Sequence, residues 1–289
     1  MRLRFLTGLS LCLLQVACGT YIPSQRDWPN SETKDVERMN RTLVRSIVCE
    51  LSYAVTVAVQ NDLELARKRR SGRTYSDYLV NWGVEVATDL TVSESATVNP
   101  TGLWAPLSPL SPVFTLTGGV SGASVATNDN TFNVFYPLSA LYKPELFRTN
   151  NQERPCRHPS TGQQGSPLVD IDLRILPLLE SRIQLVTIGL ADSPDDDRNI
   201  IAGEKNVLTQ TVSIKETISG DISPTWKFST GTVNPAGTFL SANRMRTHQV
   251  VFTFGRLARG GQSLSSLAQA FHVNEQLRAG LRETRFAPR

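Results

Sequence analysis

The chain has 289 residues, with 30 Lys and Arg against 26 Asp and Glu, and its formal net charge is +4. The charge falls to +2 when Arg2 and Arg4 are removed with a leader, so the composition gives no general signal for nucleic-acid binding. The length suffices for one large β domain or for two small ones.

The N-terminus has the layout of a secretory signal peptide. Arg2 and Arg4 form a short positive region, residues 5–14 are mostly apolar, and small residues around a cysteine follow. An apolar core of about ten residues is too short to span a bilayer, which takes about twenty. The sequence therefore predicts export of the protein.

Within this region the sequence LLQVAC, at positions 13–18, resembles the lipobox of bacterial lipoproteins. In that family cleavage precedes a cysteine that becomes acylated, so the resemblance implies a signal peptide over 1–17 and a lipid anchor at Cys18. Gln15 stands where the family prefers an aliphatic residue, and cleavage after Gly19 to give a soluble secreted or periplasmic protein is the alternative. A residue other than Asp after the cysteine implies the outer membrane, with the protein on its periplasmic face.

A polar tether is predicted over 18–32, followed by a long helix from about residue 33 to 70. Ser31 or Thr33 supplies the N-cap region, and Gly72 ends the helix. Seven apolar residues recur every three or four positions and share one helix face: Val36, Met39, Leu43, Ile47, Leu51, Ala54 and Ala58.

The C-terminal end of this helix is strongly basic, with Arg67, Lys68, Arg69 and Arg70 in succession. Cations suit this end of a helix because of its dipole. The cluster could also contact the phosphates of anionic lipid. A solvated helix end is the simpler interpretation, and contact with lipid is the alternative hypothesis.

Cys49 lies on the helix face roughly opposite the apolar stripe, at 100° per residue. A cysteine in that position is either exposed or bonded to a covering segment, and Cys156, in the loop ERPCRHP, is the only available partner. Either cleavage leaves these two cysteines, an even number that fits an oxidising compartment. A disulfide between them is one hypothesis, and two unrelated reduced thiols are the other.

From residue 82 the hydrophobic period changes to two. Apolar and polar side chains alternate over 82–98, which predicts a half-buried strand. Glu94 interrupts the apolar face, and we expect a bend or bulge there. Two more strands are predicted within 112–124 and 130–138.

The middle of the chain, residues 139–205, begins with a long polar loop. The apolar segment 168–190 then predicts a strand that enters a short helix near Pro177. An acidic run containing Asp192 and Asp195 follows. It lacks the spacing of a calcium loop, so a solvated turn is favoured over a weak calcium site.

Alternation returns in the last third of the chain and predicts strands within 208–218, 222–228 and 248–255. An amphipathic helix is predicted last, over about 262–283. Its large apolar residues lie near one side: Leu264, Leu267, Phe271, Leu277 and Leu281.

The hexapeptide TVNPTG at 97–102 recurs as TVNPAG at 232–237. Aligning the chain on these two segments places a strand end against a loop, so the predicted strands fall out of phase. The identity is therefore interpreted as accidental, and the segments as turns that end strands.

A different alignment suggests an internal duplication of two β-rich halves, about 80–138 and 206–256. Pro100 and the threonine after it match Pro224 and the threonine after it, each pair following an alternating strand. A glycine-rich segment, a polar run and an aromatic strand follow in the same order in each half. The alternative is that unrelated β segments reuse Thr, Val and Pro-Gly turns.

No constellation of residues points to catalysis or to a metal. Ser121, in GGVSGAS, does not fit the G-x-S-x-G elbow, and an envelope hydrolase would need it beside His158 or His248. His248 opens a predicted strand and is interpreted as a surface or cross-strand residue. His272 could share a helix face with Glu275, but zinc takes three or four ligands. No catalytic residue, metal or cofactor is predicted, and a non-enzymatic role is favoured.

The motifs IVCEL and SANRMRTH resemble uncharacterised envelope proteins of proteobacteria, a resemblance that implies no particular activity. The expected fold is one α+β domain over 33–289, an antiparallel sheet or sandwich of about six or seven strands with an N-terminal and a C-terminal helix. The expected function is a structural, assembly or binding role for a lipoprotein of the cell envelope, with membrane and envelope proteins as partners and no nucleic acid. A subunit of an oligomeric envelope pore and a secreted or envelope hydrolase are the alternatives.

Overall fold

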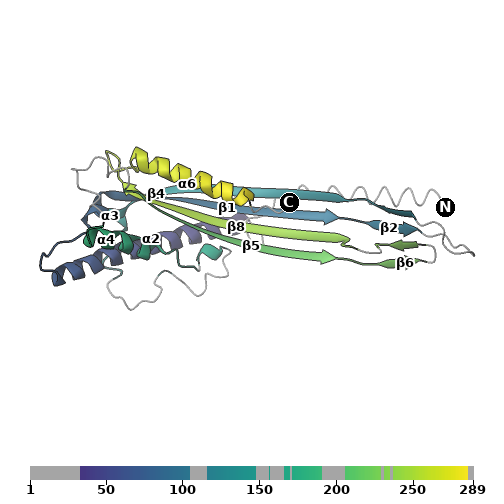
Figure 1. The fold of residues 1–289 in the computed structure, drawn as a ribbon, viewed down its shortest axis with the longest axis horizontal. Helices are drawn as coiled ribbons and strands as arrows, with labels where there is room; N and C mark the ends of the chain where they lie inside the picture. Colours follow the sequence, from purple (N-terminus) through teal and green to yellow (C-terminus); the bar gives the residue numbers. More distant parts are fainter. Residues whose placement is uncertain are drawn as a thin grey trace, which may run out of the picture. The chain divides into compact units, whose positions relative to one another are not determined.

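The computed structural model describes residues 33–104, 116–147, 156, 166–169, 171–190, 206–228, 231–234 and 237–285. Over these residues the protein is α+β, with two four-stranded antiparallel sheets and with helices at the N-terminal and C-terminal ends (Figure 1). The predicted fold class is confirmed. The strand number is eight because four short strands form a sheet of their own.

The first sheet contains the long strands in the order β4-β1-β8-β5. Their bounds are Trp82–Val98 for β1, Gly122–Pro137 for β4, Leu208–Ile222 for β5 and Leu240–Arg256 for β8. The second sheet contains the short strands in the order β3-β2-β7-β6. Their bounds are Thr101–Trp104 for β2, Leu116–Gly119 for β3, Trp226–Phe228 for β6 and Gly231–Val233 for β7.

The contacts divide the chain into two compact units, which are described separately. The described residues of unit 1 come from Leu90–Asn130 and Lys215–Thr247. Those of unit 2 come from Arg26–Asp89, Thr131–Ile214 and His248–Arg289. Each long strand contributes residues to both units, so unit 1 is almost entirely β structure and unit 2 holds the helices.

The core of unit 2 contains the long helix α2, which spans Thr33–Lys68 as its periodicity predicts. Its apolar stripe, which includes Leu43, Leu51 and Ala54, is buried, and Gly72, with φ +60°, follows the helix end. By length and composition α2 could also cross a membrane, but half of its apolar window is buried inside the protein. The burial of this stripe indicates a core helix.

Helix α6, Ser266–Arg285, packs on the strands of unit 2. Ala279 clusters with Ala87 of β1 and Val251 of β8. A Cβ atom at Gly255 of β8 would lie 2.5 Å from the Cβ of Ala268, so glycine is required for this close approach. The buried side of α6 is thus built from small residues, whereas three large apolar residues of the predicted stripe are exposed: Phe271, Leu277 and Leu281.

The strand predicted in the middle of the chain is absent, and that prediction is wrong. The segment forms a short 3-10 helix, Pro167–Val169, and helix α4, Ile175–Thr187, which contacts α2. The buried residues Ile175, Leu179 and Ile183 of α4 recur every four positions. This helical period was hidden in a continuous apolar run, which periodicity alone does not assign to a strand or a helix.

The two β-rich halves have the same element order. The first half runs long, short, short, long as β1, β2, β3 and β4, and the second repeats that order as β5, β6, β7 and β8. This succession agrees with the hypothesis of a duplication, but each half has four strands where three are expected. Strands β2 and β7 are not predicted, and the strand predicted within 112–124 is divided between β3 and the start of β4.

Candidate functional site

Side-chain hydrogen bonds fix the register between β1 and β4 in unit 1. The Thr91 hydroxyl donates to Oδ1 of Asp129 at 3.3 Å, and the Thr127 hydroxyl donates to Oγ of Ser93 at 3.2 Å. Moving two residues forward on β1 moves two residues back on β4, as antiparallel pairing requires. Thr91 therefore lies opposite Asp129.

Two Arg–Glu ion pairs cross the other junctions of the same sheet. Arg244 of β8 contacts Glu94 of β1, and Arg246 of β8 contacts Glu216 of β5 with 3.0 Å between Nε and Oε2. The Arg246 side chain is only 9% exposed. The structure assigns β1 as one strand through Val98, and the polar break at Glu94 matches a basic partner on the neighbouring strand.

A row of four residues crosses this sheet at the level of Thr91. When each ion pair is taken as a pair of directly opposed residues, antiparallel pairing places Thr247 of β8 beside Thr91 and Lys215 of β5 beside Thr247. The row therefore begins with Asp129 on end strand β4 and finishes with Lys215 on end strand β5. Both end side chains are exposed, and Lys215 makes no ion pair with any residue that the structure describes.

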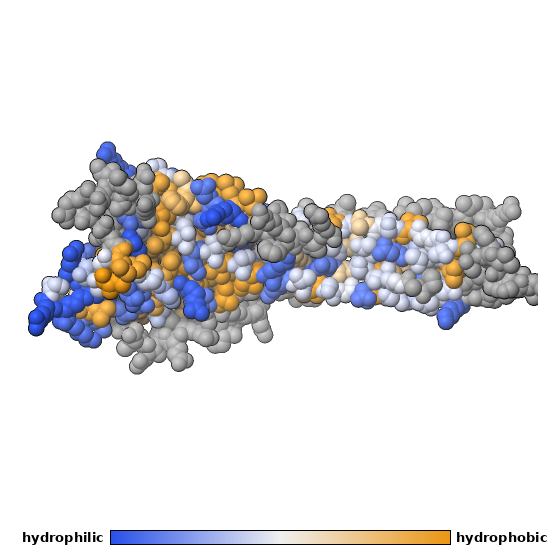
Figure 2. Space-filling model, in the orientation of Figure 1, coloured by the Kyte–Doolittle hydropathy of each residue, from blue (hydrophilic) through white to orange (hydrophobic). Residues whose placement is uncertain are grey.

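Large exposed apolar side chains of unit 1 occur on the end strands of both sheets, and some also occur on inner strands. Those on end strands are Leu116 on β3, Val125 on β4, Ile218 and Ile222 on β5, and Trp226 on β6, whereas Val98, Trp104 and Val233 lie on the inner strands β1, β2 and β7. Figure 2 shows separate hydrophobic residues among intermediate and hydrophilic ones in the region labelled β2 and β6 in Figure 1. End strands also carry backbone groups that can pair with another strand. We define β3, β4, β5 and β6 within unit 1 as the sheet edges.

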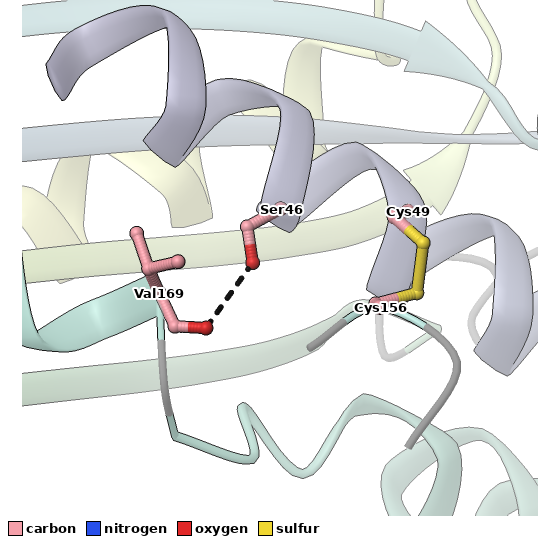
Figure 3. The surroundings of a disulfide bond; sticks show 4 residues. All are labelled: Ser46, Cys49, Cys156 and Val169. Atoms are coloured by element: carbon pink, nitrogen blue, oxygen red, sulfur yellow. Dashed lines mark hydrogen bonds between the residues drawn. A yellow bond between two sulfur atoms is a disulfide. The ribbon is translucent and has the colours of Figure 1, made fainter. Parts of the chain in front are cut away.

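The hypothetical disulfide is present: the structure joins Cys49 of α2 to Cys156, with 5.6 Å between their Cα atoms (Figure 3). The Ser46 hydroxyl, one turn earlier on α2, donates to the carbonyl oxygen of Val169 at 3.4 Å. The disulfide and this hydrogen bond tie the middle of the chain to the polar side of α2. Cys49 is thus bonded to a covering segment, as its position on the helix suggested.

The basic cluster at the end of α2 divides into two groups. Arg67, Lys68 and Arg70 are exposed, whereas Arg69 donates to Oδ1 of the buried Asp62 at 3.1 Å. The other carboxylate oxygen of Asp62 accepts the backbone N–H of Tyr75 at 2.6 Å, and the guanidinium of Arg69 lies 4.8 Å from the Tyr75 ring centroid. Arg69 therefore holds the turn after α2, and only its neighbours are placed to meet an anionic partner.

Of the two interpretations of His248, as a surface or as a cross-strand residue, the surface interpretation is wrong because the residue is fully buried within β8. Its Nδ1 lies 2.9 Å from the hydroxyl of Ser166, which is itself 4% exposed. A serine and a histidine at this distance could form a nucleophile and base. Their burial closes the pair to substrate, and packing is the better account of it.

His272 is also buried, on the side of α6 that faces the strands. Its Nδ1 lies 2.8 Å from the Thr253 hydroxyl, and its Nε2 lies 3.9 Å from a carboxylate oxygen of Glu85. Burial lowers the pKa of His272, while the carboxylate of Glu85 acts in the raising direction. Glu275 instead accepts a hydrogen bond from Arg278 at 2.9 Å. Among the described residues no group of three or more His, Cys, Asp and Glu side chains could hold a metal.

An apolar groove of about 230 Å³ lies in unit 2 between α2 and the short helices Asp77–Asn81 and Leu138–Leu141. Val55, Val59 and Leu79 are among the residues that line it. The only titratable carboxylate of its lining, Asp77, accepts a hydrogen bond from the Thr74 hydroxyl at 2.6 Å. The groove has few polar groups to orient a ligand, so the sheet edges are the stronger candidate site.

Three predicted features lie outside the described residues: the acylation site Cys18, His158, and the acidic run around Asp192. Neither Asp129 nor Lys215 is predicted as a site residue from the sequence alone. Lys215 stands on the polar side of an alternating segment and Asp129 lies in a polar run, but only the pairing order of the strands places both at sheet edges.

No protein-family model matches this sequence, and a search of curated proteins finds no relative.

Proposed function

We propose that this chain is a structural or assembly lipoprotein of the bacterial cell envelope. Cys18 anchors it to the periplasmic face of the outer membrane, and the sheet edges of unit 1 contact its partner. The observation that carries the assembly role is the position of exposed apolar residues and unmatched charges on end strands, such as Ile218 and Lys215 on β5. Strand addition at such edges is a common mode of protein recognition.

The compartment is supported by the Cys49–Cys156 disulfide together with the lipobox resemblance. Disulfides form and persist in oxidising compartments, of which the bacterial periplasm is one. An N-terminal export signal and a disulfide in the folded part are consistent with each other. A cytosolic protein of this size would be expected to keep both thiols reduced.

The two faces of β1, β8 and β5 in unit 1 support the pore hypothesis less well than they support the assembly role. One face carries the Arg244–Glu94 and Arg246–Glu216 ion pairs, which stand among the apolar residues on the same side of β1, such as Val92. On β1 the other face carries only Ser and Thr at the alternate positions 91, 93, 95 and 97. Lipid-facing strands need an apolar face, and charges there are costly. These faces favour an assembly in aqueous surroundings.

Palmitate labelling and membrane fractionation test the anchor. The wild type and a Cys12→Ala control should incorporate label and sediment with the outer membrane, whereas Cys18→Ala should lose the label and become soluble in the periplasm. Labelling of Cys18→Ala, or its unchanged sedimentation with membranes, would remove the lipoprotein proposal.

A photo-crosslinking residue placed in cells at Val125, on end strand β4, tests the assembly role. Leu63, on α2 in unit 2, provides an exposed apolar control position. We expect discrete high-mass products from position 125 and far less from position 63. No crosslinking at position 125, or no more than at position 63, would count against an assembly role for the sheet edges.

A further inference from the structure

We infer that the partner at the sheet edges is a second copy of this chain. In the proposed junction, β5 of one copy pairs antiparallel with β4 of the next, and β6 pairs with β3. The inference rests on the assembly role proposed above and deepens it by naming the partner. It is independent of lipidation.

The strand order carries the first argument. In the order β4-β1-β8-β5, β4 and β1 are the last and the first strand of the first half. The strands β8 and β5 are the last and the first strand of the second half. The halves are therefore related by a translation along the sheet. The internal junction joins the first strand of one half, β1, to the last strand of the other, β8.

A junction between copies would repeat this internal junction. Its strands would be β5, the first strand of the second half, and β4, the last strand of the first half. Both are end strands among the described strands of this sheet, and an end strand has one edge that can pair with a new strand.

The second sheet has the same property. Its order, β3-β2-β7-β6, again places the two halves head to tail, with β2 antiparallel to β7 in the internal junction. Within it Gly102 pairs with Val233 and Trp104 pairs with Gly231. The end strand β6 corresponds to β2, and the end strand β3 corresponds to β7. A single translation from one copy to the next would therefore pair the end strands of both sheets.

The register of the new junction follows from the internal one. The alignment of Pro100 with Pro224 relates β1 to β5 and makes Lys215 the equivalent of Thr91. Asp129 lies opposite Thr91 in the first half, and Thr247 lies opposite Lys215 in the second half. Asp129 and Thr247 are therefore equivalent as well. Thr91 faces Thr247 inside one copy, so Lys215 would face Asp129 of the next copy.

This register places complementary chemistry across the junction. The exposed ammonium of Lys215 meets the exposed carboxylate of Asp129, and the row that crosses one copy continues into the next. Three residues further along β5, Ile218 meets the small Ala126 of β4, so its apolar side chain gains cover without a clash. Directly opposed side chains in a sheet stand close enough for both interactions.

The geometry also determines the kind of assembly. The two surfaces that meet are different, so the contact is heterologous and adds copies in one direction until a ring closes or a filament grows. An isologous dimer would instead use the same strand from both copies. Stoichiometry above two is therefore part of the inference.

Paired cysteines test the register in the purified full chain with Cys18→Ala. The double variant Asp129→Cys/Lys215→Cys, treated with a short bifunctional thiol reagent, should give a ladder of dimers, trimers and higher species on denaturing gels. Within one copy the two positions are three strand spacings apart, about 14 Å, so a short reagent favours links between copies. Each single variant should give dimers at most.

Charge exchange tests the same contact without a covalent link. Lys215→Asp should weaken assembly about two- to fivefold by light scattering, as expected for an exposed ion pair. Lys215→Asp/Asp129→Lys should restore it. Asp221→Lys is the matched control, because Asp221 is also exposed on β5 but would face Ala123.

The inference is overturned if the Cys18→Ala protein stays monomeric at every concentration and the double-cysteine variant gives no species above a dimer. It is also overturned if the charge exchange fails to restore what Lys215→Asp loses. Circular dichroism and the intact Cys49–Cys156 disulfide check that each variant folds. A monomeric protein that still labels with palmitate and crosslinks to a different protein would leave the proposed function standing and remove only this inference.

Discussion

Asn234 and Thr101 bind each other across the junction between the two halves of the chain. The backbone N–H of Asn234 donates to the carbonyl oxygen of Thr101 at 2.7 Å, and the Thr101 hydroxyl lies 3.4 Å from Oδ1 of Asn234. These residues belong to TVNPTG and TVNPAG, so the end of the first hexapeptide meets the described start of the second where β2 pairs with β7. The interpretation of their identity as accidental missed this contact.

Asn234 also binds the second half, which makes it the link between the two matched Pro-Thr pairs. Its Nδ2 donates to the carbonyl oxygen of Pro224 at 2.7 Å, and its own carbonyl accepts the Thr225 hydroxyl at 2.9 Å. The residue is 1% exposed and has φ +52°, a conformation that asparagine tolerates better than most residues.

Replacement of Asn234 should destabilise unit 1. Asn234→Ala loses the side-chain hydrogen bonds and strains a positive φ, and we expect a loss of about 2–3 kcal/mol. Asn234→Gly keeps the backbone conformation and should lose about half as much. Urea denaturation measures both, and equal losses in the two variants would show that the backbone conformation contributes nothing.

Removal of the Cys49–Cys156 disulfide should destabilise unit 2. The bond joins residues separated by 107 positions, and closure of a loop of about 100 residues restricts the unfolded chain by about 4–5 kcal/mol. Cys49→Ala/Cys156→Ala should therefore unfold at a clearly lower urea concentration than the Cys18→Ala parent. An unchanged midpoint would mean that the bond does not form in the cell or does not constrain the unfolded chain.

Substitutions at the basic end of α2 should distinguish an effect on stability from an effect on surface charge. Arg69→Gln removes the only charged partner that the described residues offer to the buried Asp62, and we expect a loss of about 1–3 kcal/mol in the free energy of unfolding. Arg70→Gln, an exposed neighbour, should change it by less than about 0.5 kcal/mol. If anionic vesicles bind this end of the helix, Arg70→Gln should weaken their binding, whereas a neutral vesicle shows no difference.

Acid should destabilise unit 2 through His272. Burial lowers its pKa in the folded protein, so as the pH falls below the unfolded value of about 6.5 the unfolded chain binds the proton first. The contribution of His272 to the free energy of unfolding is fully present above the unfolded pKa. It is lost as the pH falls from the unfolded pKa to the lower folded pKa. His272→Gln should flatten the pH dependence of the free energy of unfolding in this window, and an unchanged slope would assign the effect to another group.

Much of the secondary structure follows from periodicity. The apolar stripe of α2 is continuous over most of its length, and the alternation in β1 predicts both of its ends, Trp82 and Val98. The start of β8 was missed because its first residues, from Leu240, are mostly polar and alternate weakly. Ion pairs to neighbouring strands hold Arg244 and Arg246 in that segment, and such pairs are not visible in the pattern of one strand.

The sequence by itself determined the α+β class, the long helix and the long alternating strands, and it suggested a duplication of two β-rich halves, because each depends on local periodicity or on internal similarity. It also limited the disulfide to one pair of cysteines. Only the tertiary structure decided that β1 pairs with β8, that Asn234 joins the two hexapeptides, and that Asp129 and Lys215 stand on opposite end strands. Strand neighbours are chosen by contacts between residues far apart in the chain, and no local pattern contains that choice.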